Sequence, residues 1–99
     1  MERGGYVYIV SNKSHSVIYI GVTSQLRSRI YEHKNHLYSN SFSHRYNLED
    51  IVYYECFFSI EEAIAREKQI KKWRREKKDA IINEFNPQWI DLWDEIQEL

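Results

Sequence analysis

The chain has 99 residues, which is enough for one compact domain and too few for two. Hydrophobic residues make up 42% of the sequence and aromatic residues 15%, so a single core of ordinary size can form. The apolar runs at 17–22 and 51–58 are far shorter than the roughly 20 residues that a membrane-spanning helix needs. No apolar segment of signal-peptide type precedes the first strand-like segment. We therefore expect one domain over residues 1–99, a cytoplasmic location and no membrane contact.

The net charge of -1 conceals an uneven distribution of charged residues. Residues 79–99 contain six acidic residues and no Lys or Arg. Residues 1–78 contain 14 basic and nine acidic residues, a net charge of +5. This asymmetry predicts a basic surface that can bind a polyanion.

The first two elements are predicted to form an antiparallel hairpin. Residues 6–10 and 17–22 are rich in β-branched and aromatic side chains, and the polar residues 11–16 separate them. Strand alternation places apolar side chains on one face, namely Val7, Ile9, Ile18, Ile20 and Val22. The other face receives Tyr6, Tyr8, Tyr19 and Gly21. We expect one core-like face and one tyrosine-lined face.

A helix is predicted over residues 24–37, with Ser24 as its N-cap. Its buried stripe consists of Leu26, Ile30, His33 and Leu37. A loop is expected over residues 40–47, which are rich in Ser, Asn and His, and a third strand over 51–58.

A second helix is expected to begin near residue 60, because Ser59 and Glu62 have the spacing of a capping box. Its apolar stripe consists of Ile60, Ala63, Ile64, Ile70 and Trp73. Glu67 occupies a position where this stripe calls for a hydrophobic residue. A carboxylate at this position requires an ion-pair partner or a functional role, because burying a charge costs free energy.

Two further helices complete the predicted fold. The basic residues 71–78 lead into Ala80-Ile81-Ile82, which extends the second helix or starts another. Asn86 and Pro87 are predicted as the N-cap and first residue of a last helix, which docks by apolar residues at amphipathic spacing: Trp89, Leu92, Trp93 and Ile96. The fold class is α+β, a three-stranded antiparallel sheet flanked by helices in the order β-β-α-β-α-α-α.

Five positions now form a pattern in the order and spacing of a known family. They lie in Gly5-Tyr6-Val7-Tyr8-Ile9, in Tyr19-Ile20-Gly21, at Arg29 with His33 four residues later, and at Glu67. The chain resembles the GIY-YIG nuclease family from about Tyr6 to about Trp93, with a variant first triplet. The stretch from Asn86 to Trp93 is similar to the small stand-alone, single-domain bacterial branch.

The resemblance implies a divalent-metal-dependent endonuclease that hydrolyses phosphodiester bonds in DNA, structure-specific in repair or recombination and weak or partner-dependent in activity. Tyr8 would be the general base, and Glu67 would bind one Mg²⁺ or Mn²⁺ ion. Arg29 would contact the scissile phosphate, while Tyr19 and His33 would position the water or relay its proton. A free phenol titrates near pH ~10, so a nearby cation must lower the pKa of Tyr8. All these side chains are expected to face a common hollow.

Contacts to nucleic acid are expected at Gly21, Arg27, Lys71, Lys72, Arg74 and Arg75. Gly21 would leave the approach of the phosphate open, because it has no side chain. The basic residues would bind phosphates independently of base sequence, and a solvated helix surface explains them equally well. Asn86 matches the region of a family asparagine, although its place before Pro87 also explains it as a helix cap.

Other interpretations of the same residues remain open. Tyr8 and Tyr19 are also compatible with ordinary cross-strand aromatic partners, and Glu67 with an ion pair to Arg66 or Lys71. The whole chain could be a non-catalytic nucleic-acid-binding module, or a protein-interaction domain that uses its C-terminal helix. The expected partner is nucleic acid, DNA more than RNA, with a protein partner that directs the enzyme to its substrate. The sequence does not define the oligomeric state.

Overall fold

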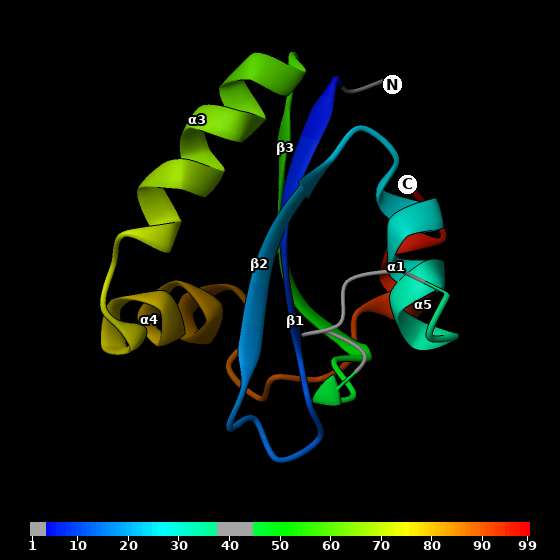
Figure 1. Cartoon of the computed structure of the whole chain (residues 1–99), viewed down its shortest axis with the longest axis vertical. Coiled ribbons are helices and arrows are strands. Elements are labelled where there is room, and N and C mark those ends of the chain that lie inside the picture. Colours follow the sequence, from blue (N-terminus) through cyan, green and yellow to red (C-terminus); the bar gives the residue numbers. More distant parts are fainter. Residues whose placement is uncertain (1–3, 38–44) are drawn as a thin grey trace.

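A computed structural model describes residues 4–37 and 45–99 of the chain (Figure 1). The elements are β1 (Gly5–Ser11), β2 (Ile18–Thr23), α1 (Leu26–Lys34), β3 (Asp50–Phe57), α3 (Ile60–Lys71), α4 (Arg75–Phe85) and α5 (Trp93–Ile96). The α+β class and the predicted order of strands and helices are confirmed. The loop predicted over 40–47 lies outside the described residues as far as residue 44. In the described ranges, no helix is both long enough and apolar enough to cross a bilayer.

The three strands form an antiparallel sheet in the order β2-β1-β3, so β1 is central and β2 is an edge strand. Tyr8 lies opposite Gly21 and Val10 opposite Tyr19 in the register of the first pair. Cross-strand partners share a face of the sheet, so both tyrosines lie on the same face, as the alternation predicted.

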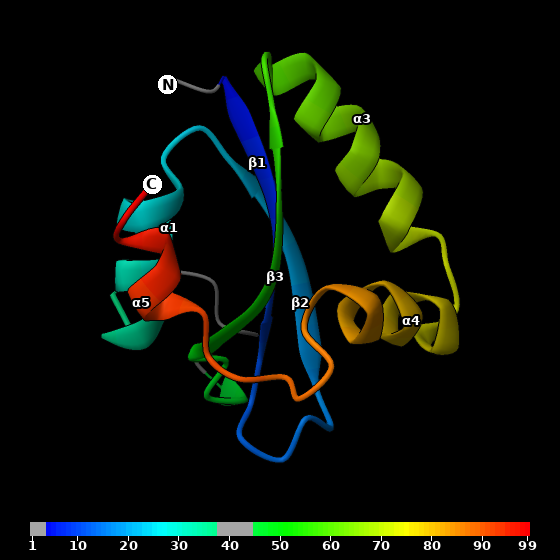
Figure 2. The same ribbon diagram turned by 180° about the vertical axis from the view of Figure 1, so that it is seen from behind.

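Helices cover both faces of this sheet (Figures 1 and 2). Helices α3 and α4 pack on the face that contains Val7 and Ile9. Helices α1 and α5 cover the opposite face, where Tyr8 is fully buried among Val10 and Ile30. The prediction of only one core-like face is therefore wrong, because α1 and the C-terminal segment build a second core over the tyrosines.

Helix α1 is shorter than predicted at both ends. It begins at Leu26, and its N-cap is Gln25, whose side chain makes no capping bond. Ser24 is not the cap, because Oγ1 of Thr23 accepts the Gln25 backbone N–H at 3.0 Å and forms the turn instead. The predicted buried residues are confirmed for Leu26, Ile30 and His33. Leu37 lies beyond the helix end and is exposed, so its place in the stripe was wrong.

Helix α3 begins as the local sequence predicts. Ser59 accepts a hydrogen bond from the Glu62 backbone N–H, and the Glu62 side chain accepts one from the Ser59 backbone N–H. Ala63 and Ile70 are buried against the sheet. The side chain of Glu67 is only 13% exposed, consistent with its position in the apolar stripe.

The predicted helix start at Asn86 and Pro87 is wrong. Asn86 is the C-cap of α4, and the next helix begins only at Trp93. The Asn86 amide donates to the carbonyl oxygens of Val52 and Ile90 at 3.1 and 2.8 Å, and its oxygen accepts the Ile90 backbone N–H. These bonds fix an irregular loop against β3, in which Trp89 has a positive φ of 52° that no helix allows.

Candidate active site

Tyr8 and Gly21 form one packing unit across the β1–β2 pair. A Cβ atom on Gly21 would overlap a ring carbon and the hydroxyl oxygen of Tyr8. The absence of a side chain at Gly21 therefore makes room for the phenol ring itself. This differs from the expectation that Gly21 clears a path for phosphate, and it explains why the tyrosine and the glycine occur as partners.

The buried hydroxyl of Tyr8 lies 3.1 Å from Nε2 of His33 on α1. Burial, and to a smaller extent the positive charge of Arg29, lower the pKa of His33 to about 4. His33 is consequently neutral at pH 7, and a neutral imidazole has one nitrogen that accepts a hydrogen bond. The Tyr8 hydroxyl can therefore donate to Nε2 of His33.

Tyr19 completes a group of three aromatic rings. Its ring centroid lies 6.5 Å from that of Tyr8 and 6.0 Å from that of His33, with tilted planes. The Tyr8 and His33 rings are 5.6 Å apart in an edge-on arrangement. We call Tyr8, Tyr19 and His33 the aromatic trio. Tyr19 lies on the edge strand β2 and is half-buried, so the trio reaches the surface through it.

Arg29 precedes His33 by about one turn of α1 and lies beside the trio. Its guanidinium Nε pairs with Glu32 at 3.2 Å, and its side chain is 29% exposed. Arg29 and Glu32 line a surface hollow of about 400 Å³ that extends to Ser24 and to Ile60 of α3. A positive group is thus accessible between the N-terminal ends of α1 and α3.

Glu67 is the predicted residue that the structure does not place in contact with the trio. Helix α3 lies on the opposite side of the sheet from α1 (Figures 1 and 2). The Glu67 carboxylate pairs with Lys71 at 3.0 Å, and Nζ of Lys71 lies 5.9 Å from the centroid of the Tyr19 ring. Because β2 is an edge strand, the Lys71 side chain of α3 can reach Tyr19 past the edge of the sheet. Instead of sharing one hollow with the trio, Glu67 is connected to it through Lys71.

The donor groups are compatible with a single hard divalent cation. No group of three or more His, Cys, Asp and Glu side chains that could bind a metal occurs in residues 4–37 and 45–99. Mg²⁺ commonly retains several waters and is bound by one or two carboxylates together with substrate phosphate. The shielded carboxylate of Glu67 fits that mode of binding, and Lys71 is the cation now beside it.

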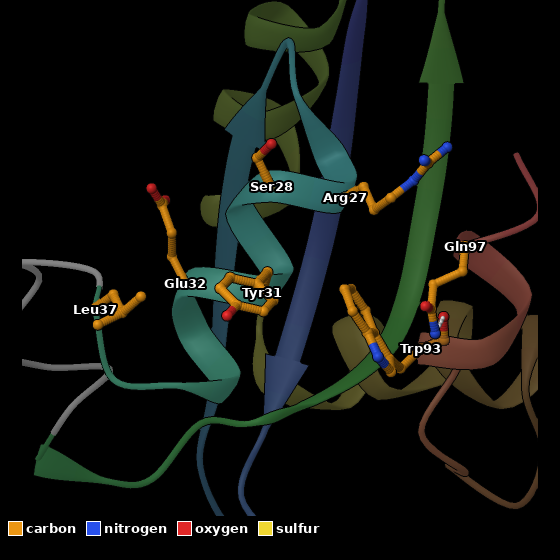
Figure 3. A pocket seen from close by; sticks show the side chains of 7 residues that line it. All are labelled: Arg27, Ser28, Tyr31, Glu32, Leu37, Trp93 and Gln97. Atoms are coloured by element: carbon orange, nitrogen blue, oxygen red, sulfur yellow. Dashed lines mark hydrogen bonds between the residues drawn. The ribbon is translucent and has the colours of Figure 1, made fainter.

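The basic residues expected to contact nucleic acid differ in their surroundings. Arg27 donates to the backbone carbonyl of Leu99 at 2.8 Å. It lines a groove of about 710 Å³ between α1 and α5, together with Tyr31 and Trp93 (Figure 3). Arg27 is therefore on the outer side of α1, whereas His33 points into the core. No feature of the sequence predicted this groove.

The basic residues between 71 and 78 also differ in their surroundings. Arg75 donates to the backbone carbonyls of His15 and Ser16 and pairs with Asp79, so it fixes the hairpin loop to α4. Lys72 and Arg74 are exposed at the turn between α3 and α4. These two remain available for phosphate. The hydrogen bonds of Asn86 account for its presence without a role in chemistry.

Comparison with known proteins agrees with this arrangement of motifs. The GIY-YIG catalytic domain matches residues 4–80. The chain belongs to the GIY-YIG family. The matched region contains the aromatic trio, Arg29 and Glu67, while α5 lies beyond it.

The curated relatives are small proteins of similar length. A UPF0213 protein of Bacillus pumilus (strain SAFR-032) is 31% identical over 85 residues, which cover 86% of each chain. A UPF0213 protein of Haloquadratum walsbyi is 34% identical over 79 residues, 80% of this chain and 86% of its own. One from Staphylococcus saprophyticus is 35% identical over 79 residues, 80% of this chain and 94% of its own. These relatives are consistent with a stand-alone GIY-YIG protein, and no solved structure matches the chain significantly.

Proposed function

We propose that this GIY-YIG protein is a divalent-metal-dependent endonuclease that hydrolyses phosphodiester bonds in DNA, with structured DNA of repair or recombination as its substrate class. The observation that supports this best is the hydrogen bond between Tyr8 and a neutral His33 beside the cationic Arg29. Membership of a nuclease family supplies the reaction type.

The trio provides a route for the proton of the attacking water. A phenol is a weak base at neutral pH, since it titrates near pH ~10. We propose that Tyr8 accepts the proton of the water as its own proton passes to Nε2 of His33, which becomes a stronger base once substrate phosphate offsets the charge of Arg29 and water enters the site. The water oxygen forms a bond to phosphorus, the bond from phosphorus to the leaving oxygen breaks, and that oxygen takes up a proton from solvent. His33 then returns the proton that it received to solvent, which restores the starting state. The relay needs no free phenolate.

The remaining residues position and neutralise the phosphate. Arg29 would contact the scissile phosphate from the hollow that it lines, and Tyr19 would orient the water. Glu67 would bind one Mg²⁺ or Mn²⁺ ion, which when bound supplies a Lewis acid for the developing charge.

The burial of Tyr8 has a consequence for substrate binding. Tyr8 is fully buried, whereas Tyr19 and Arg29 are partly exposed. Nucleic acid would therefore meet Tyr19 and Arg29 first, and these side chains must move before water reaches the Tyr8 hydroxyl. We expect cleavage to be slow on substrates that do not engage both.

The experiment is incubation with plasmid, single-stranded and branched DNA in the presence of Mg²⁺ or Mn²⁺. The wild type is compared with Tyr8→Phe and Glu67→Gln, and with Tyr6→Phe as a matched control on the same strand. Loss of general-base catalysis is expected to slow cleavage by about 100-fold or more in Tyr8→Phe, with little change in Tyr6→Phe.

Absence of metal-dependent cleavage of every substrate by the wild type would overturn the proposal. DNA binding retained in that case would indicate a non-catalytic nucleic-acid-binding module. If neither DNA binding nor cleavage occurs, a protein-interaction domain becomes the better account.

A further inference from the structure

The ion pair between Glu67 and Lys71 differs from an ordinary surface pair in where its two groups lie. The Glu67 side chain is 13% exposed and the Lys71 side chain 47%, so the carboxylate is shielded and the ammonium is not. Nζ of Lys71 lies 3.0 Å from the carboxylate oxygen and 5.9 Å from the centre of the Tyr19 ring. The ammonium is thus paired with the carboxylate and lies near the Tyr19 ring of the aromatic trio.

A divalent cation bound to Glu67 would compete with this ammonium for the same carboxylate. Glutamate and lysine four residues apart on a helix form pairs that open readily, because their attraction is weak in a high dielectric. The flexible lysine side chain can move into solvent while the shielded carboxylate stays in place. Exchange therefore requires no change in the backbone of α3.

The released ammonium has an alternative partner close by. Lys71 is already near Tyr19, the member of the trio through which nucleic acid would reach the site. A phosphate at that point would attract the ammonium, which binds phosphate as a point charge. Nucleic acid would thereby remove the competitor from Glu67.

We propose that Lys71 is an exchangeable cation that occupies the metal position at Glu67 in the free protein and moves to the substrate phosphate when metal binds. The proposal rests on the proposed function, and it assigns regulation to that same site. Its consequence is positive coupling: nucleic acid raises the affinity for metal, and metal raises the affinity for nucleic acid by the same factor. A complete site then assembles only when both are present.

The test is a calorimetric titration of Mn²⁺ into the wild type and three variants without nucleic acid. Lys71→Met removes the competitor, Lys68→Met removes the same charge from an exposed position on the same helix, and Glu67→Gln removes the ligand. The proposal predicts that Lys71→Met binds Mn²⁺ at least about fivefold more tightly than the wild type, since a charge next to the ion disappears. Lys68→Met should differ by less than about twofold, because exposed charges farther away are screened.

The same titration is repeated with a saturating oligonucleotide whose phosphorothioate linkages resist cleavage. Mn²⁺ affinity should rise in the wild type and in Lys68→Met, and it should rise by a clearly smaller factor in Lys71→Met, where the phosphate adds a ligand but no competing ammonium is displaced. Equal Mn²⁺ affinities for Lys71→Met and Lys68→Met would overturn the proposal and leave the enzyme claim intact. Mn²⁺ binding that is absent, or unchanged by Glu67→Gln, would overturn both the exchange and the metal site. Circular dichroism of each variant confirms that it is folded.

Discussion

The two faces of the three-stranded sheet bury different kinds of side chain. The face under α3 and α4 is filled by side chains such as Ile9, Val52 and Ile82, which have no polar atoms to satisfy. The face under α1 and α5 buries the polar groups of Tyr8 and His33 inside a similar apolar shell. Apart from Glu67 on α3, the first face serves the stability of the fold, whereas the second buries polar groups at a cost in free energy that the proposed chemistry explains.

The largest expected effect comes from the apolar face. Ile82→Ala removes a fully buried side chain of α4 and leaves a cavity, which should lower the free energy of unfolding by about 2–5 kcal/mol. Urea denaturation measures this loss. Cleavage per folded molecule should remain at the wild-type level, and a marked fall would show that the two faces are not separate in function.

The second effect concerns the opposite face of the sheet and the pH dependence of stability. The pKa of His33 is about 4 in the folded protein against an ordinary value of 6.5, so between these pH values the unfolded chain binds the extra proton. Stability should therefore be complete above pH 6.5 and decrease as the pH falls toward 4. At about 1.4 kcal/mol per pKa unit, the total loss is on the order of 3 kcal/mol.

Urea titrations between pH 4 and pH 7 test this linkage against His33→Gln, whose side chain does not titrate. The difference in pH dependence between the two proteins should match the stated loss. Parallel curves would show that His33 is protonated as easily in the folded protein as in the unfolded chain.

Gly21→Ala tests the fit between the two motifs on this face. The new methyl group would overlap the Tyr8 ring, and overpacking of this kind costs about 1–3 kcal/mol. Because the overlap includes the Tyr8 hydroxyl, which lies against His33, we expect the cleavage rate per folded molecule to fall as well. Ser11→Ala, at a buried position elsewhere on β1, is the control. Full activity in Gly21→Ala would indicate that Tyr8 need not hold its present position.

The smallest effect is expected at the surface. Glu32→Gln removes the ion-pair partner of Arg29, which should change stability by less than about 1 kcal/mol. It should increase DNA affinity by a few fold at low salt, because a negative charge that competes with phosphate for the guanidinium is removed. Fluorescence anisotropy at two salt concentrations measures this, with Glu61→Gln on α3 as the control. Unchanged affinity would place the phosphate away from Arg29.

The sequence correctly predicted several features that depend on residues close together in the chain. The capping box at Ser59 and the shared face of Tyr8 and Tyr19 depend on residues close in sequence or on simple alternation. The prediction for Ser24 was wrong because the neighbouring Thr23 forms the turn before α1 through a local hydrogen bond. The prediction for Asn86 was wrong because its amide binds the backbone of β3, which lies far away in the sequence.

The candidate site shows the same division. The spacing of the motifs identified the residues of the trio, but neither the burial of Tyr8 nor the low pKa of His33 could be predicted, since both depend on how α1 and α5 cover the sheet. The sequence suggested Lys71 both as a phosphate contact and as an ion-pair partner of Glu67, and the structure confirms the ion pair. Its position near Tyr19 could not be predicted, because it arises only when α3 packs beside the edge strand.

A double-mutant cycle on the cleavage rate tests the proposed proton relay between Tyr8 and His33 most directly. Single-turnover rates are measured for the wild type, Tyr8→Phe, His33→Gln and the double variant at saturating metal. If the two residues act as one relay, the double variant is no slower than Tyr8→Phe alone, because either change already breaks the transfer. Multiplication of the two single effects in the double variant would contradict the account, since it would mean that each residue acts independently.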